Sequence, residues 1–203
     1  TITAYGLATP AADLASAAGR MVEWFGARFG PLPYGEIKIV ETDLPIAYGG
    51  MEYPGLIMLS SGYGPLRPGS AYDALIAHEI AHQWFYAHVG SDQIADPWLD
   101  EGFATYAPAL FYEATLPDVG RSTLAQIESA RVVGQLDRTL YEFSDDGPYF
   151  AAIYRPGARL LHELRRAMGG PAFDEATRTY VSTFGDRLAT PRATLDLYQR
   201  FTA

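Results

Sequence analysis

The sequence of 203 residues contains no cysteine, so no disulfide can form and the redox compartment stays open. It has a single lysine, Lys38, and otherwise uses arginine, which we interpret as genome composition. No apolar run is long enough to span a bilayer. The chain begins at Thr1 without a signal-like segment, which indicates an excised domain or a processed product and leaves the localisation unknown.

Basic residues are also too few to balance the acidic ones, and the formal net charge is −9. This charge argues against nucleic acid and anionic membranes as main partners. Apolar residues make up 48% of the chain, enough to bury a sizeable core. The length fits one domain, or one domain with two lobes.

Histidine is scarce as well, yet two of the four histidines lie four residues apart, in the segment His78-Glu79-Ile80-Ala81-His82. Residues at this spacing project from one face of a helix, so two imidazoles can bind one metal ion. Glu79 can then reach a metal-bound water. The alternative for either histidine alone is a packed core residue without a ligand.

Signals around this segment predict the helix and a third ligand. Ser70 and Asp73 form a start signal, and Gly90 is a stop signal. Asp96, which precedes a proline, is expected to cap a second helix that carries Glu101 just over one turn from its start. Two histidines and one glutamate leave a fourth metal position for water, which is the catalytic pattern.

The remaining pattern predicts a sheet first and helices afterwards. A helix is expected over residues 10–30, and strands over 36–41 and 51–60. Pro54 places the second strand at a sheet edge, and Gly49-Gly50 marks a turn or a close backbone approach. Beyond Pro97 there is almost no strand signal, and the expected helices are 97–114, 118–135, 148–168, 171–184 and 191–201.

An edge strand beside a metal helix suits a peptidase, because an extended peptide can add to it as one more strand. Glu52 lies on this expected edge. From its position alone, an ordinary solvated surface glutamate is the simpler interpretation.

Three motifs in one order give the sequence a resemblance to a known family. Residues 78–85 read HEIAHQWF, and 18 residues separate His82 from Glu101 in WLDEGFATY. These segments resemble HELAHQWFG and WLNEGFA of the gluzincin aminopeptidases, the group of aminopeptidase N and leukotriene hydrolase. Residues 48–54 (YGGMEYP) resemble the family's G-A-M-E-N or G-G-M-E-N strand, and 154–158 (YRPGA) its Y-x-K-G-A segment. The resemblance covers about residues 45–165.

The resemblance implies a thermolysin-like α+β zincin fold and one Zn²⁺ per chain, bound by His78, His82 and Glu101. We therefore expect a single metallopeptidase catalytic domain over 1–203. Its lobe 1–90 carries the small mixed sheet and the metal helix, and its lobe 91–203 is helical.

The resemblance also implies the catalytic roles. Glu79 activates the zinc-bound water, and Tyr154 donates a hydrogen bond to the oxyanion that develops during attack. Pro156 stands where the family usually has lysine, so Tyr149 is kept as the alternative to Tyr154.

The strand motif implies how substrate is held. The glutamate that matches Glu52 binds the substrate's free α-amino group in this family, with Gly50 and Met51 beside it. Tyr53 and Asp100 depart from the family's asparagines. The expected function is removal of amino-terminal residues from peptides.

Two alternatives stay open at this point. Family members usually carry a β-rich domain before this one and a helical domain after it, and we expect such flanking domains to lie outside this chain. Without them the cleft is open, so a zinc endopeptidase is kept as the first alternative. The other alternative is a non-catalytic domain that binds metal and peptides.

Overall fold

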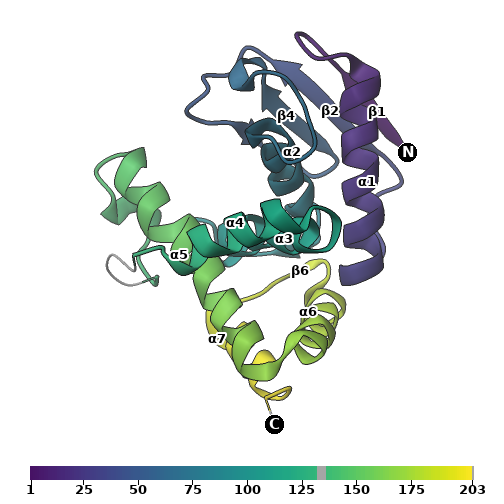
Figure 1. Ribbon diagram of the computed structural model, residues 1–203. Coiled ribbons are helices and arrows are strands. Elements are labelled where there is room, and N and C mark those ends of the chain that lie inside the picture. Colours follow the sequence, from purple (N-terminus) through teal and green to yellow (C-terminus); the bar gives the residue numbers. More distant parts are fainter. Residues whose placement is uncertain (132–135, 203) are drawn as a thin grey trace.

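A computed structural model describes residues 1–131 and 136–202, with a sheet at one end of the molecule and helices at the other (Figure 1). The elements of the first part are β1 (Ile2–Tyr5), α1 (Ala11–Phe29), β2 (Ile37–Thr42), β3 (Gly50–Met51), β4 (Leu56–Ser60), the short 3-10 helix η1 (Ser61–Tyr63), α2 (Ala71–Ala81) and β5 (Val89–Gly90). The expected first helix and first strand are confirmed. Strand β1 was not expected from the sequence.

The sheet has the strand order β1-β2-β4-β3, with parallel pairing except between β3 and β4. Strand β2 alternates, so that Ile37 and Ile39 are fully buried while Lys38 faces solvent. Helix α1 covers the sheet with Leu14, Met21 and Phe25, all fully buried. Helix α2 packs against α1 and also contacts the edge strand β3.

The expected strand over residues 51–60 is wrong, because Pro54 and Gly55 lie in a turn between β3 and β4. Gly55 has φ 71°, which favours glycine in that turn. The edge position is correct, but β3 occupies it and its antiparallel partner β4 does not.

The expected helix from Ser70 toward Gly90 also ends early, with His82 as the residue that caps α2. Beyond it, backbone N–H groups bond to carbonyls three residues back, as Gln83 does to Ile80 at 3.0 Å. Tyr86 then takes φ 144°, where the resembling motif has glycine. The chain therefore turns away from the helix axis directly after the second histidine.

The second part is mostly helical. Its elements are α3 (Trp98–Thr115), α4 (Pro117–Glu128), the 3-10 helix η2 (Leu140–Glu142), α5 (Asp146–Met168), α6 (Gly170–Phe184), β6 (Arg187–Leu188) and α7 (Pro191–Gln199). The predicted helices are present, although residues 132–135 of the second one lie outside the described residues. Strand β6 was not expected, and it pairs in parallel with β5.

Helix α3 does not begin with the expected aspartate cap. Its capping residue is Pro97, without a side-chain hydrogen bond, and the side chain that orders the preceding turn is Asp92. Asp92 Oδ1 accepts hydrogen bonds from the backbone N–H groups of Ile94 and Ala95, both at 3.0 Å. The predicted cap at Asp96 is therefore wrong, and Asp92, earlier in the chain, makes the side-chain hydrogen bonds that order this turn.

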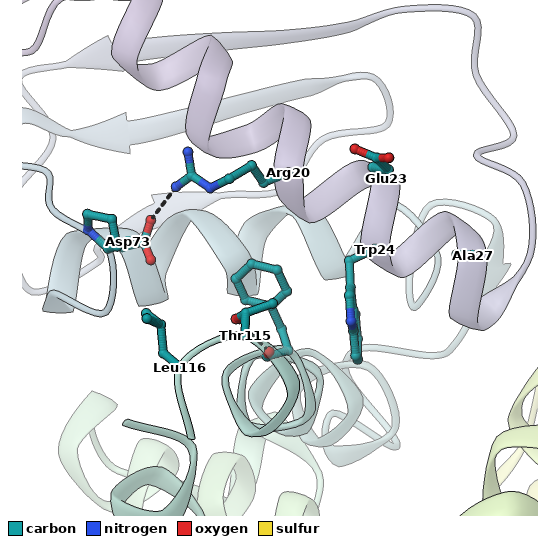
Figure 2. A pocket seen from close by; sticks show the side chains of 9 residues that line it. Arg20, Glu23, Trp24, Ala27, Asp73, Thr115 and Leu116 are labelled. Carbon is teal, nitrogen blue, oxygen red and sulfur yellow. Dashed lines mark hydrogen bonds and ion pairs between the residues drawn. The ribbon is translucent and has the colours of Figure 1, made fainter. Parts of the chain in front are cut away.

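A cavity of about 490 Å³ lies between α1, the start of α2 and the junction of α3 with α4 (Figure 2). Its walls include Trp24, Phe111 and Leu116, and Arg20 forms an ion pair with the buried Asp73 at 3.6 Å. Asp73 also accepts a hydrogen bond from Tyr112 at 2.8 Å, which ties α2 to α3. None of the predicted site residues lines this cavity.

Across the described residues, no helix is both long and apolar enough to cross a membrane. The α+β class agrees with the expectation. The division into lobes 1–90 and 91–203 stays a prediction.

Candidate active site

Helix α2 presents His78 and His82 on one face. Ser70 caps the helix by accepting a hydrogen bond from the backbone N–H of Asp73 at 3.2 Å. The two Nε2 atoms of the histidines lie 3.1 Å apart. His82 Nδ1 donates to the carbonyl of Phe85 at 3.1 Å, a bond made possible by the turn after α2. This bond leaves Nε2 of His82 as the free acceptor that a metal ion requires.

Glu101 reaches the same point from the first turn of α3. Its Oε2 atom lies 3.2 Å from Nε2 of His78 and 3.5 Å from Nε2 of His82. Although it is buried, Oε2 has no hydrogen-bond partner in the described structure. Tetrahedral ligands of Zn²⁺ are separated by roughly 3.3 Å when bonds are about 2.0–2.1 Å. The three atoms therefore fit one metal ion, and together they could hold it.

Glu79 lies beside this cluster and is 4% exposed. Its Oε2 atom also has no hydrogen-bond partner in the part of the chain that the structure describes. A Cβ added to Gly50 of β3 would lie 2.5 Å from Glu79 Oε1, so any larger residue there would displace the Glu79 side chain. Burial raises the pKa of Glu79 to about 7, although His78 and His82 oppose the shift. A carboxyl group of such a pKa can accept and release a proton near neutrality.

Tyr154 approaches from α5. Its hydroxyl donates to Glu101 Oε1 at 2.8 Å, and its ring stacks on His78 with centroids 5.8 Å apart. Burial and the charge of Glu101 raise the pKa of Tyr154, so its hydroxyl keeps its proton. Tyr149 lies behind it, with ring centroids 5.8 Å apart, and does not line the cavity at the histidines.

Two glycines let α5 come this close to α3. A Cβ on Gly157 would lie 3.0 Å from Cα of Gly102, and a Cβ on Gly102 would lie 3.0 Å from the carbonyl carbon of Gly157. Gly102 follows the candidate ligand Glu101 directly, and Gly157 is three residues after Tyr154. The contact between the two helices thus fixes the hydrogen bond between those side chains.

Glu52 is buried at 7% exposure, which rules out a solvated surface position. Gln93 Nε2 donates to Glu52 Oε1 at 3.3 Å and to Asp100 Oδ2 at 2.8 Å. The backbone of Gly55 donates to Gln83 Oε1 at 2.9 Å, so the turn after Glu52 is attached to the end of α2. Carboxylate atoms of Glu52 and Glu79 lie within 4.8 Å of each other and of a ring nitrogen of His82.

A cavity of about 450 Å³ joins these groups. It is lined by Glu52, Glu79, the three candidate ligands and Tyr154, together with Gly50, whereas Met51 pairs with Met58 in the sheet and does not line it. No pattern in the sequence pointed to Gln93, whose role depends on a loop conformation. None pointed to Phe150 or Arg155 either, which line the cavity because α5 packs beside α3.

An H-E-x-x-H helix that faces a glutamate helix, beside a small mixed sheet, defines an α+β domain of the zincin metallopeptidase class. Comparison with known proteins gives the family. The chain belongs to peptidase family M1: the family model described as "Peptidase family M1 domain" matches residues 15–202. The predicted family and fold are confirmed.

Sequence and structure comparisons with individual proteins are consistent with membership in this family. Endoplasmic reticulum aminopeptidase 2 of Homo sapiens is 30% identical over 162 residues, and leucine aminopeptidase 2 of Eremothecium gossypii is 29% identical over 186 residues. The alignments cover 70% and 84% of this chain. The crystal structure of an M1 zinc metallopeptidase from Deinococcus radiodurans matches 96% of the chain with a TM-score of 0.75 and 29% identity.

The chain is much shorter than these proteins. It spans 17% and 29% of the two curated relatives and 41% of the solved chain. The matching segment is the one that carries the candidate site.

Proposed function

We propose that this chain is the catalytic domain of a zinc-dependent aminopeptidase that removes amino-terminal residues from peptides. The observation that carries the proposal is the convergence of His78 Nε2, His82 Nε2 and Glu101 Oε2 at 3.1–3.5 Å. The buried Oε2 atoms of Glu79 and Glu101 support it, because neither has a hydrogen-bond partner among the described residues. Buried carboxylate oxygens normally have donors, so both atoms fit a site built for a cation and a water.

When bound by these three ligands, zinc lowers the pKa of a coordinated water and polarises the scissile carbonyl. Glu79 accepts a proton from the attacking water and later passes it to the leaving amine. Tyr154 turns its hydroxyl from Glu101 to the developing oxyanion and donates a hydrogen bond there. Burial keeps the proton on Tyr154, which this role requires.

Glu52 binds the protonated amino group of the substrate. Its burial strengthens such a pair, because a charge-assisted hydrogen bond shielded from water contributes about 1.5–3 kcal/mol. Gln93 holds Glu52 in place at 3.3 Å but leaves the second carboxylate oxygen for the substrate. The short distance between Glu52 and Glu79 supports this role, because an amino group bound at Glu52 leaves room for the first peptide bond at the candidate metal centre.

The test compares aminoacyl-coumarin substrates with the same peptides carrying blocked amino termini, with and without a chelator. We expect cleavage of the free-amino substrates alone, abolished by the chelator. Glu52→Ala should lower kcat/KM on free-amino peptides by roughly 10- to 100-fold. Any residual cleavage of blocked peptides should stay nearly unchanged, because those peptides offer no cation to pair.

Other outcomes assign other functions. Rapid chelator-sensitive cleavage of blocked peptides would identify a zinc endopeptidase. Binding of peptides without any cleavage would identify a non-catalytic domain. Equal losses on both substrate types in Glu52→Ala would remove Glu52 from its assigned role.

A further inference from the structure

The active-site cavity has a neighbour that the proposed mechanism does not use. A second cavity of about 530 Å³ shares Phe150, Tyr154 and Arg155 with it. Its other lining residues are Ala130, Arg131, Gly147 and Ala151. The three shared residues place the second cavity beside the active-site cavity, on the side of Phe150 and Tyr154.

The two cavities differ in charge. The active-site cavity contains Glu52, Glu79 and Glu101, whereas no acidic residue lines the second one. The second cavity is lined by Arg131 and by Arg155, which it shares with the active-site cavity, and both side chains are exposed to solvent. A substrate that crosses both cavities therefore meets negative charge at one end and positive charge at the other.

Neither arginine has a carboxylate partner among the described residues. Arg155 donates to the neutral side-chain oxygen of Gln126 at 3.4 Å, and Arg131 forms no ion pair there. Among the described residues, six other arginines pair with acids, as Arg165 does with Glu113 at 2.7 Å. In a chain of net charge −9, two guanidinium groups without acidic partners at one cavity are available to a ligand.

We propose that this second cavity is a subsite for the carboxy-terminal carboxylate of short peptide substrates. A guanidinium group binds a carboxylate through two parallel hydrogen bonds, which lysine cannot reproduce. Opposite charges at the two ends of the combined cavity select a peptide with both termini free and one direction of binding. The inference rests on the proposed function, because peptide polarity comes from the amino-group role of Glu52.

The test uses Ala-Ala-Ala and its carboxy-terminal amide as substrates. Each arginine contributes the effect of one exposed ion pair, so kcat/KM should favour the free acid by roughly 5- to 20-fold. The preference should appear mainly in KM, since the carboxylate lies away from the bond that breaks. It should weaken as ionic strength rises.

Substitutions test whether Arg131 and Arg155 cause the preference for the free acid over the amide. Arg131→Gln and Arg155→Gln should each reduce the ratio of acid to amide, and the double variant should bring it close to one. Arg166→Gln removes the same charge from α5 at a residue paired with Glu128 at 3.7 Å, outside both cavities. The ratio should be unchanged in this control. A ratio of one in the parent protein, or a ratio that survives the double variant, would overturn the subsite.

A third peptide, Ala-Ala-Asp amide, separates two sources of a carboxylate. Preference for this peptide without preference for Ala-Ala-Ala would overturn the carboxy-terminal assignment in favour of an acidic side chain. Calorimetric binding of the acid and amide to Glu79→Gln gives the same ratio without hydrolysis. If the parent cleaves neither peptide while the Kd ratio persists, the proposed function fails and the subsite stands. If the parent instead cleaves the acid and the amide at equal rates, the proposed function stands and the subsite is overturned.

Discussion

At the scale of single residues, the site combines side chains that were predictable from the sequence with others that were not. His78, Glu79 and His82 belong to one helical turn, so their spacing alone fixes their relative positions. Gln93 was not predictable, because its bonds to Glu52 and Asp100 depend on a loop that leaves no periodic signal. The roles assigned to these side chains are tested most sharply by substitutions that keep their shape.

Glu79→Gln removes the proton acceptor and keeps the volume. We expect normal zinc content and unfolding temperature, with kcat reduced at least ~10²-fold, the usual scale for loss of a general base. Steady-state kinetics measures the change, and metal analysis of the same preparation is the control. A variant that hydrolyses peptides as fast as the parent would contradict the assignment of Glu79.

Tyr154→Phe removes one hydrogen-bond donor from the oxyanion. It should lower kcat by ~10²–10³ with little change in KM, because the bond strengthens only as charge develops. Tyr149→Phe is the matched control, since Tyr149 contacts the ring of Tyr154 but does not line the cavity at the histidines. If the loss appeared in Tyr149→Phe and not in Tyr154→Phe, the two roles would have to be exchanged.

At the scale of elements, long periodic segments were predicted well and short ones poorly. Helix α1 followed from its apolar spacing, whereas β1, with four residues, depends on pairing with β2 more than 30 positions later. The early end of α2 was missed because the turn after His82, which brings the carbonyl of Phe85 to Nδ1 of His82, leaves no signal in the local sequence. The close approach expected at Gly49-Gly50 is confirmed, and its partner is Glu79.

The contact between α3 and α5 gives an element-scale prediction. Gly157→Ala adds a methyl group 3.0 Å from Cα of Gly102, so the helices must separate. We expect a stability loss of about 1–3 kcal/mol from overpacking, and a lower kcat because Tyr154 moves relative to Glu101. Chemical unfolding and kinetics on one preparation test both effects.

Gly19→Ala in α1 is the control for this change. A Cβ at Gly19 meets only Ile2 Cδ1 at 4.0 Å, so alanine should be neutral or stabilising by up to about 1 kcal/mol. If Gly157→Ala were equally harmless in stability and rate, the glycine contact would have no part in holding the site.

At the scale of the whole molecule, Glu41 connects three parts of the first half. Its carboxylate accepts hydrogen bonds from the backbone N–H groups of Leu7, Ala8 and Thr9 and from Tyr72 of α2 at 2.7 Å. Burial alone would raise the pKa of Glu41, but these bonds lower it to about 2. The sequence showed Glu41 only as the end of a strand, since its partners come from elsewhere in the chain.

This depressed pKa makes stability depend on pH. Ionised Glu41 makes its full contribution to folding stability at pH values above the ordinary glutamate pKa of about 4.5. This contribution is lost as the pH falls from there through the lowered pKa of about 2. Glu41→Gln should therefore cost about 1.5–3 kcal/mol at pH 7 and less at pH 3. Urea unfolding at both pH values measures the difference in unfolding free energy between the parent and Glu41→Gln, with the more exposed Glu36→Gln as control. A difference that did not become smaller in acid would contradict the ionic role of Glu41.

The central claim is that His78, His82 and Glu101 hold one zinc ion, and metal content per chain tests it most directly. Elemental analysis of purified protein should give about one zinc, and His82→Ala and Glu101→Ala should lose most of it. His88→Ala is the matched control, because His88 lies 3.4 Å from Asp186 and away from the cluster, and it should keep its zinc. Full zinc in both His82→Ala and Glu101→Ala would show that the metal is bound elsewhere.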